Sequence, residues 1–174
     1  NKEEVKDISK YLIYYVVMSL HGNNWIERAV VLMGQLSRNG KSTFIDIIKK
    51  TFCDYVGNLD LKYFTTYDKS SNSPHPELLD IQGCRIVNIN EAGGQEQKLI
   101  PHKFKALVGG DLITERTLYS KKMVSFRNSA IFFMPSNFQL NFTTQGNDTT
   151  GKLDYFEFNN YYGELGTIGW DGNK

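Results

Sequence analysis

One stretch of the sequence, residues 30–44, constrains the fold more than any other part of the chain. It reads VVLMGQLSRNGKSTF: an apolar, β-branched run, a loop bounded by glycines, and Lys-Ser-Thr opening an amphipathic segment. This is the strand–loop–helix order of a phosphate-binding loop, where backbone N–H groups and the helix dipole attract an anion. The stretch therefore predicts an α/β fold with a phosphate site at the end of a strand.

Side chains of this loop have specific expected roles. Lys41 would reach the β- and γ-phosphates of ATP, and the Ser42 hydroxyl would coordinate Mg²⁺. The residues expected to bind the nucleotide are Gly34, Ser37, Arg38, Asn39, Gly40, Lys41, Ser42 and Thr43. Five residues separate Gly34 from Gly40, one more than usual, so either the loop bulges or Gly34 is only a strand-ending turn. An ordinary Asn-Gly turn before a lysine is the alternative without a ligand.

Composition limits the classes of protein to consider. The 174 residues, 40% of them hydrophobic, suit one domain with a core, and no apolar run approaches the length of a membrane span. The formal net charge of +1 does not by itself point to nucleic acid. Two cysteines are too few for a disulfide framework, which fits a reducing compartment. The chain begins with Asn and no signal-like segment, so we expect a piece of a longer protein.

Hydrophobic periodicity and turn residues predict alternating helices and strands. Helices are expected over residues 2–20, 43–52, 77–82 and 101–108. Buried strands are expected within 25–33, over 84–89 and over 130–134. This alternation indicates an α/β sheet that is parallel in its centre. The expected organisation is a helical lead-in over 1–25, a core over 26–158, and a loosely attached polar, glycine-rich tail over 159–174.

Nucleotide hydrolysis needs an acid near Mg²⁺ and a polar sensor of the γ-phosphate. Glu91 follows a buried strand, at the end where α/β sheets place their ligands, and is the expected base or water-polarising group. With Ser42 and Asn90 it forms the expected Mg²⁺ site. Asn137 follows the next buried strand and is the candidate sensor. The alternatives are a solvated strand-end carboxylate for Glu91 and a turn-forming asparagine for Asn137.

Basic charge is concentrated between residues 98 and 127. Seven basic and two acidic residues give this segment a formal charge of +5 and leave −4 for the remainder. Residues 119–123 are expected to form a hairpin tip, where Tyr119 either stacks on a base or packs inside the hairpin. The expected DNA-binding residues are Lys105, Arg116, Tyr119, Lys121 and Lys122. A solvated basic face is the alternative.

The order of these motifs resembles the helicase domain of superfamily 3, in the branch of the primase–helicases of large DNA viruses, phages and plasmids. Four segments carry the resemblance: Asn-Gly-Lys-Ser at 39–42, an apolar strand ending in an acid at 86–91, Lys-x-Leu-x-Gly-Gly-Asp at 105–111 with Arg116 downstream, and a strand ending in Ser-Asn at 131–137. The resemblance covers roughly residues 11–158. The third segment discriminates most, because generic phosphate-loop proteins lack it.

The resemblance implies a modified AAA+ core, with a mainly parallel central sheet flanked by helices and a DNA-binding hairpin. It implies a homo-oligomer, a hexameric ring that hydrolyses ATP between subunits and moves along single-stranded DNA at a replication fork. A neighbouring subunit would supply a basic finger, and Lys152 stands where the family has arginine. It also implies a primase region on the same polypeptide, no membrane, and a viral, phage or plasmid protein in the cytoplasm or a replication compartment of a host cell.

Two other functions stay open. Asn90 and Lys152, where the family has Asp and Arg, suggest a ring-forming ATP-binding scaffold or initiator with weak turnover. A small-molecule kinase could use the same loop, but the basic hairpin, the Gly-Gly-Asp segment and the lack of an obvious arginine-rich lid argue against it. An ATPase assay with and without DNA would separate the three.

Overall fold

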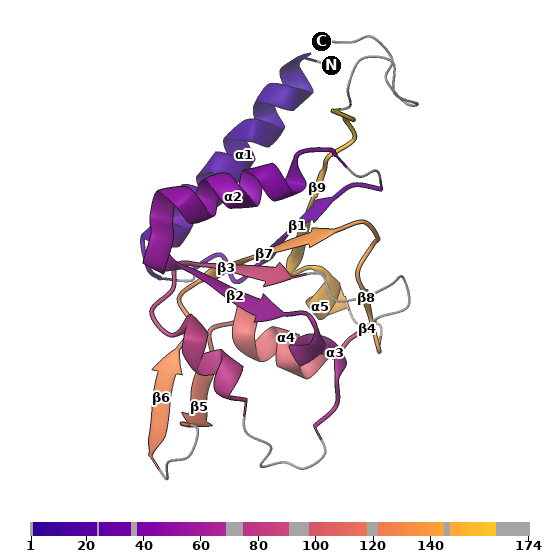
Figure 1. Cartoon of the computed structure of the whole chain (residues 1–174). Coiled ribbons are helices and arrows are strands. Elements are labelled where there is room, and N and C mark those ends of the chain that lie inside the picture. Colours follow the sequence, from indigo (N-terminus) through magenta and orange to yellow (C-terminus); the bar gives the residue numbers. More distant parts are fainter. Residues whose placement is uncertain are drawn as a thin grey trace.

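The chain folds around a five-stranded parallel sheet with helices on both faces (Figure 1). The structure is a computed structural model, which describes residues 2–23, 25–35, 38–68, 75–90, 98–117, 122–144 and 147–162. The strand order is β2-β3-β7-β1-β9. The predicted α/β class with a mainly parallel central sheet is therefore confirmed.

The elements follow the chain in a simple order. The N-terminal half contains α1 (Lys2–Leu20), β1 (Ala29–Met33), α2 (Lys41–Phe52), the 3₁₀ helix η1 (Cys53–Tyr55), β2 (Val56–Asp60), α3 (Lys62–Thr65), the 3₁₀ helix η2 (Pro76–Ile81) and β3 (Ile86–Asn90). The C-terminal half contains β4 (Lys98–Leu99), α4 (Pro101–Val108), β5 (Leu112–Arg116), β6 (Met123–Arg127), β7 (Ile131–Ser136), β8 (Asn141–Phe142), α5 (Asn147–Thr150) and β9 (Leu153–Glu157). Beside the main sheet, β4 pairs with β8, and β5 pairs with β6.

Strand side chains alternate between two hydrophobic cores, as the period of two requires. In β1, Val30 and Leu32 belong to the core beneath α1 and α2, while Ala29 and Val31 belong to the core on the side of α4 and η2. All four are fully buried. A strand buried on both faces carries a continuous apolar run, which is why the sequence predicts β1 and β7 well.

Two strands of the sheet differ from the sequence prediction. β2 was not predicted, because Gly57, Asn58 and Asp60 interrupt its apolar residues; it lies at the sheet edge, where polar side chains are tolerated. β7 continues through Pro135 to Ser136, beyond its predicted end at residue 134. The pairing of β7 with β3 ends at Phe133, so Pro135 has only β1 beside it and its missing N–H is tolerated.

The predicted hairpin is present as the antiparallel pair β5–β6, which extends away from the main sheet (Figure 1). Residues 118–121 at its tip lie outside the described residues. The predicted short helix near 77–82 is η2, and α2 begins at Lys41, two residues earlier than predicted. Among the helices of the described ranges, none has the length and apolar character that crossing a bilayer requires.

Candidate functional site

The predicted site residues lie along the carboxyl edge of three neighbouring strands. Gly34 follows β1, Asn137 follows β7, and Asn90 is the last residue of β3. These strands are adjacent in the sheet and all parallel, so their carboxyl ends share one edge. Ligands of open α/β sheets bind at this edge.

Lys41 is the centre of the arrangement. Its ammonium donates to the carbonyl oxygen of Gly34 at 2.7 Å and to Oδ1 of Asn137 at 2.9 Å. The residue is only 7% exposed, although it is the first residue of α2. A buried ammonium needs such partners, and here they come from the ends of the two strands that flank the predicted phosphate position.

Gly34 is a site of close backbone approach. A Cβ atom there would lie 2.1 Å from Nδ2 of Asn39 and 2.7 Å from the carbonyl oxygen of Phe158. The Gly34 N–H donates to the carbonyl of Ser136, so the residue also extends the pairing of β1 with β7. Gly34 is therefore part of the site, and more than a strand-ending turn.

The loop ends in backbone conformations that favour an exposed helix N-terminus. Gly40 is the N-cap residue of α2, with φ 92°, a left-handed conformation that glycine adopts without strain. Glycine has no side chain to cap the first N–H groups of α2, so those donors point toward an anion. Arg38 also has a positive φ, 57°, which is rare for a residue with a side chain and is typical of functional loops.

Asn137 is positioned by a tight turn at the end of β7. The buried Ser136 hydroxyl donates to the carbonyl of Phe138 at 2.6 Å and accepts from the Phe138 N–H at 3.1 Å. This local bonding bends the chain directly after Asn137. The asparagine amide consequently faces Lys41.

A cavity of about 680 Å³ lies beside the loop and the first turns of α2. Leu12 of α1, Phe44 and Ile47 of α2, and Phe158 give it apolar walls, and Gly40 forms one end. Residues 159–162, the first four of the predicted tail, also line it. The Tyr162 N–H donates to the carbonyl of Arg38 at 2.8 Å, so this segment is held against the loop.

Sequence reasoning missed a polar row that leads to Asn90. Nδ2 of the buried Asn88 donates to Oδ1 of Asn90 at 2.6 Å and to Oδ1 of Asn58 at 3.3 Å. Asn88 and Asn90 are two residues apart on one strand and so share a face. The sequence signal is the asparagine at alternate positions of an otherwise apolar strand. The row orients the Asn90 amide at the end of β3.

The remaining predicted residues do not lie beside Lys41. Lys152 precedes β9, at the amino edge of the sheet, and pairs with Glu27 at 2.9 Å. Lys105 is on α4, and Arg116 and Lys122 lie on the hairpin, with Lys122 accepting from Thr117 N–H. The structure thus separates the basic residues from the carboxyl edge.

Four predicted residues lie outside the described residues: Ser37, Glu91, Tyr119 and Lys121. Ser42 and Thr43 are exposed in the first turn of α2. Within the described ranges, no group of three or more His, Cys, Asp or Glu is arranged to hold a metal ion. The Mg²⁺ site of Ser42, Asn90 and Glu91 stays a prediction.

Comparison with known proteins gives one family and several relatives. The chain is 32% identical over 116 residues to "Putative helicase L207/L206" of Acanthamoeba polyphaga mimivirus, a match that covers 67% of the chain and 12% of that protein. The chain thus spans only a small part of this relative.

Solved structures of the NrS-1 C-terminal region in its apo state share the fold. One has a TM-score of 0.67 at 18% identity, covering 96% of this chain and 38% of that one. Another has a TM-score of 0.57 at 16% identity, covering 88% and 35%. A family model described as "Family of unknown function (DUF5906)" matches residues 32–152. That match spans well over half of the sequence, and the chain belongs to the DUF5906 family.

Proposed function

We propose that this chain is the ATPase core of a replicative DNA helicase, which hydrolyses ATP with Mg²⁺ between the subunits of a ring and moves along single-stranded DNA. The observation that carries the proposal is the contact of Lys41 with Gly34 and Asn137 at the carboxyl edge. It brings the loop lysine and the candidate γ-phosphate sensor within one phosphate of each other.

The described residues fit a nucleoside triphosphate. Lys41 and the N–H groups that begin α2 supply positive charge and donors for the phosphates. The cavity of about 680 Å³ beside Gly40 has apolar walls and the size that ligand pockets have, so it suits the base and ribose. ATP and Mg²⁺ are thus the cofactors that we assign to this edge, with Ser42, Asn90 and Glu91 toward the metal.

Similarity in sequence to a protein named as a helicase supports the choice of DNA as partner. The basic residues Arg116 and Lys122 on the β5–β6 hairpin support it independently, because lysine and arginine bind the phosphate backbone without reading sequence. The ring, its hexameric state and a primase region on the same polypeptide belong to the proposal through the resemblance to superfamily 3.

A ring-forming ATP-binding scaffold with weak turnover is the second candidate. Asn90 at the end of β3 brings no charge to the metal, and Lys152 lacks the bidentate fork of an arginine. Both features would slow hydrolysis while leaving nucleotide binding intact. Under this candidate, ATP would bind tightly and DNA would not stimulate turnover.

The test compares ATP binding and hydrolysis with and without an oligo-dT strand, at protein concentrations that span assembly. Lys41→Ala should abolish binding or turnover, and Glu91→Gln should bind ATP but hydrolyse it poorly. Lys50→Ala, which removes an exposed lysine from the same helix, serves as the control and should behave as wild type. Turnover that survives Lys41→Ala would rule out the proposed site.

A further inference from the structure

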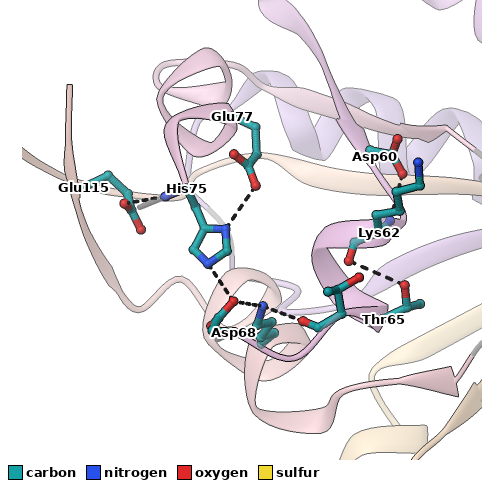
Figure 2. Close-up of polar contacts among 9 residues, drawn as sticks. Asp60, Lys62, Thr65, Asp68, His75, Glu77 and Glu115 are labelled. Carbon is teal, nitrogen blue, oxygen red and sulfur yellow. Dashed lines mark hydrogen bonds and ion pairs between the residues drawn. The ribbon is translucent and has the colours of Figure 1, made fainter. Parts of the chain in front are cut away.

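The β5–β6 hairpin meets the body of the protein at a polar cluster that lies apart from the nucleotide site (Figure 2). The cluster, called here the His75 cluster, consists of Asp68, His75, Glu77, Lys103 and Glu115. It joins the segment after α3, the start of η2, helix α4 and strand β5. Contacts across such different parts of the chain fix their relative positions.

Lys103 anchors one side of the cluster to α4. Its ammonium donates to Oδ1 of Asp68 at 2.6 Å and to the carbonyl of Thr66 at 2.9 Å, and lies 4.9 Å from the ring centre of Tyr63. Lys103 is 5% exposed, and a buried ammonium that loses its carboxylate is strongly destabilising. Asp68 is therefore firmly held to α4.

His75 lies between two carboxylates. Its Nδ1 is 3.1 Å from Oε1 of Glu77, and its Nε2 is 2.9 Å from Oδ1 of Asp68, an ion-pair distance without hydrogen-bond angles. A ring nitrogen that faces a carboxylate must carry the proton, so the two contacts together need the imidazolium form. The ring also packs edge-on against Tyr63, with centroids 5.2 Å apart. These contacts fix the backbone at His75.

Glu115 fastens the hairpin to that backbone. The N–H of His75 donates to Oε2 of Glu115 at 3.0 Å (Figure 2). Glu115 shares the inward face of β5 with Ile113, which is 8% exposed and belongs to the core. At the other end of the hairpin, the buried Asn128 donates to the carbonyl of Leu107 in α4. A two-stranded hairpin is only marginally stable alone, so these contacts set its direction.

We propose that Glu115 and His75 are positioning residues that set the direction of the β5–β6 hairpin relative to the central sheet. Through Asp68 and Lys103 the same contacts tie the hairpin to α4, the helix that leads directly into β5. The tether rests on geometry alone. Its consequence for activity rests on the proposed function, because the candidate DNA contacts lie on this hairpin.

Amide hydrogen exchange of the chain without nucleotide or DNA tests the tether directly. Glu115→Ala should raise the exchange rates of the His75 amide and of the Thr117 amide, which bonds across the hairpin, by roughly ten-fold or more, the worth of a hydrogen bond to a charged group. Glu115→Gln keeps an acceptor oxygen and should stay near wild type. Thr114→Val, on the exposed face of β5, is the control.

Unchanged exchange in Glu115→Ala, or equal acceleration in Glu115→Gln, would overturn the tether. Glu115→Asp keeps the charge but shortens the side chain by one carbon, and it provides a milder test if the alanine variant does not fold. It should accelerate exchange at both amides while unfolding at the wild-type temperature, and wild-type exchange in this variant would overturn the tether as well.

The consequence for activity has its own readout. Glu115→Ala should lose several-fold in the stimulation of ATP hydrolysis by oligo-dT, while the KM for ATP without DNA stays unchanged, and Glu115→Gln should restore the stimulation. Full stimulation in Glu115→Ala would refute the coupling. A wild-type protein without ATP turnover would instead refute the proposed function, and the exchange rates would still decide the tether.

Discussion

Replacing Gly34 by alanine tests the close approach of the loop to the segment after β9. The new Cβ would lie 2.7 Å from the carbonyl oxygen of Phe158, against an ordinary contact of at least 3.4 Å, so a shift of 3.4 − 2.7 = 0.7 Å is needed. The Asn39 amide, at 2.1 Å, can rotate away, but Phe158 cannot shift freely because its N–H donates to the Met33 carbonyl at 2.7 Å. The loop therefore has to move.

Overpacking of this size costs about 1–3 kcal/mol. For a chain of this length each kcal/mol lowers Tm by about 2–4 °C. The carbonyl of Gly34 accepts from Lys41, so a displaced loop also misplaces the ammonium. Gly34→Ala should accordingly lower Tm and weaken ATP binding together, as measured by thermal unfolding and by titration with ATP and Mg²⁺.

Gly83→Ala is the matched control for this prediction. A Cβ atom there meets nothing within 4 Å, but φ is +81°, so the substitution strains the backbone without any close contact. It should cost about 1 kcal/mol of stability and leave ATP binding unchanged. If Gly34→Ala binds ATP as tightly as Gly83→Ala does, the close approach at Gly34 is unrelated to the nucleotide.

Three further expectations concern charged residues. Lys152→Ala should slow hydrolysis while sparing ATP binding, and loss of its exposed pair with Glu27 should cost at most about 1 kcal/mol in thermal unfolding; unchanged turnover would assign the finger to another residue. Lys121→Ala combined with Lys122→Ala should lower the slope of log affinity against log salt for single-stranded DNA by about 0.7 per lost phosphate contact, and an identical slope would place DNA elsewhere. Burial alone would raise the pKa of Asp68, but its hydrogen bond to Lys103, with the charges of Lys103 and His75, outweighs burial and lowers it. The folded pKa is then below the unfolded one, so this carboxylate stabilises the fold at neutral pH and loses that contribution as pH falls below about 3.8. In denaturant unfolding at a series of pH values, the deficit of Asp68→Asn should shrink in that range, and a constant deficit would contradict this.

Local patterns predicted the elements whose signals are contained in one stretch. Helix α1 has the predicted bounds because apolar residues recur at helical spacing and His21-Gly22 ends the pattern. The strand and helix around the phosphate loop were predicted for the same reason. The sequence also located Asn137 and the hairpin, since each follows or precedes an apolar run.

What could not be predicted depends on which distant segments become neighbours. Lys41 and Asn137 are 96 positions apart, and their contact exists because β7 pairs with β1. Glu115 and His75 are 40 positions apart, and no periodicity joins them. Likewise, Tyr162 lies in a polar stretch that resembles a free tail, yet its backbone bonds to Arg38.

The position of Lys152 restricts how copies of this chain could cooperate. β1 and β9 run in register from Ala29 and Leu153, so Lys152 and the phosphate loop lie at opposite ends of a five-residue strand, about 13 Å apart at roughly 3.3 Å per residue. A subunit cannot supply this lysine to its own nucleotide. A lysine that acts on a neighbour requires unlike surfaces to meet, a head-to-tail contact that closes into a circle or grows into a filament. Inactive Lys41→Ala and Lys152→Ala subunits would then complement each other when mixed.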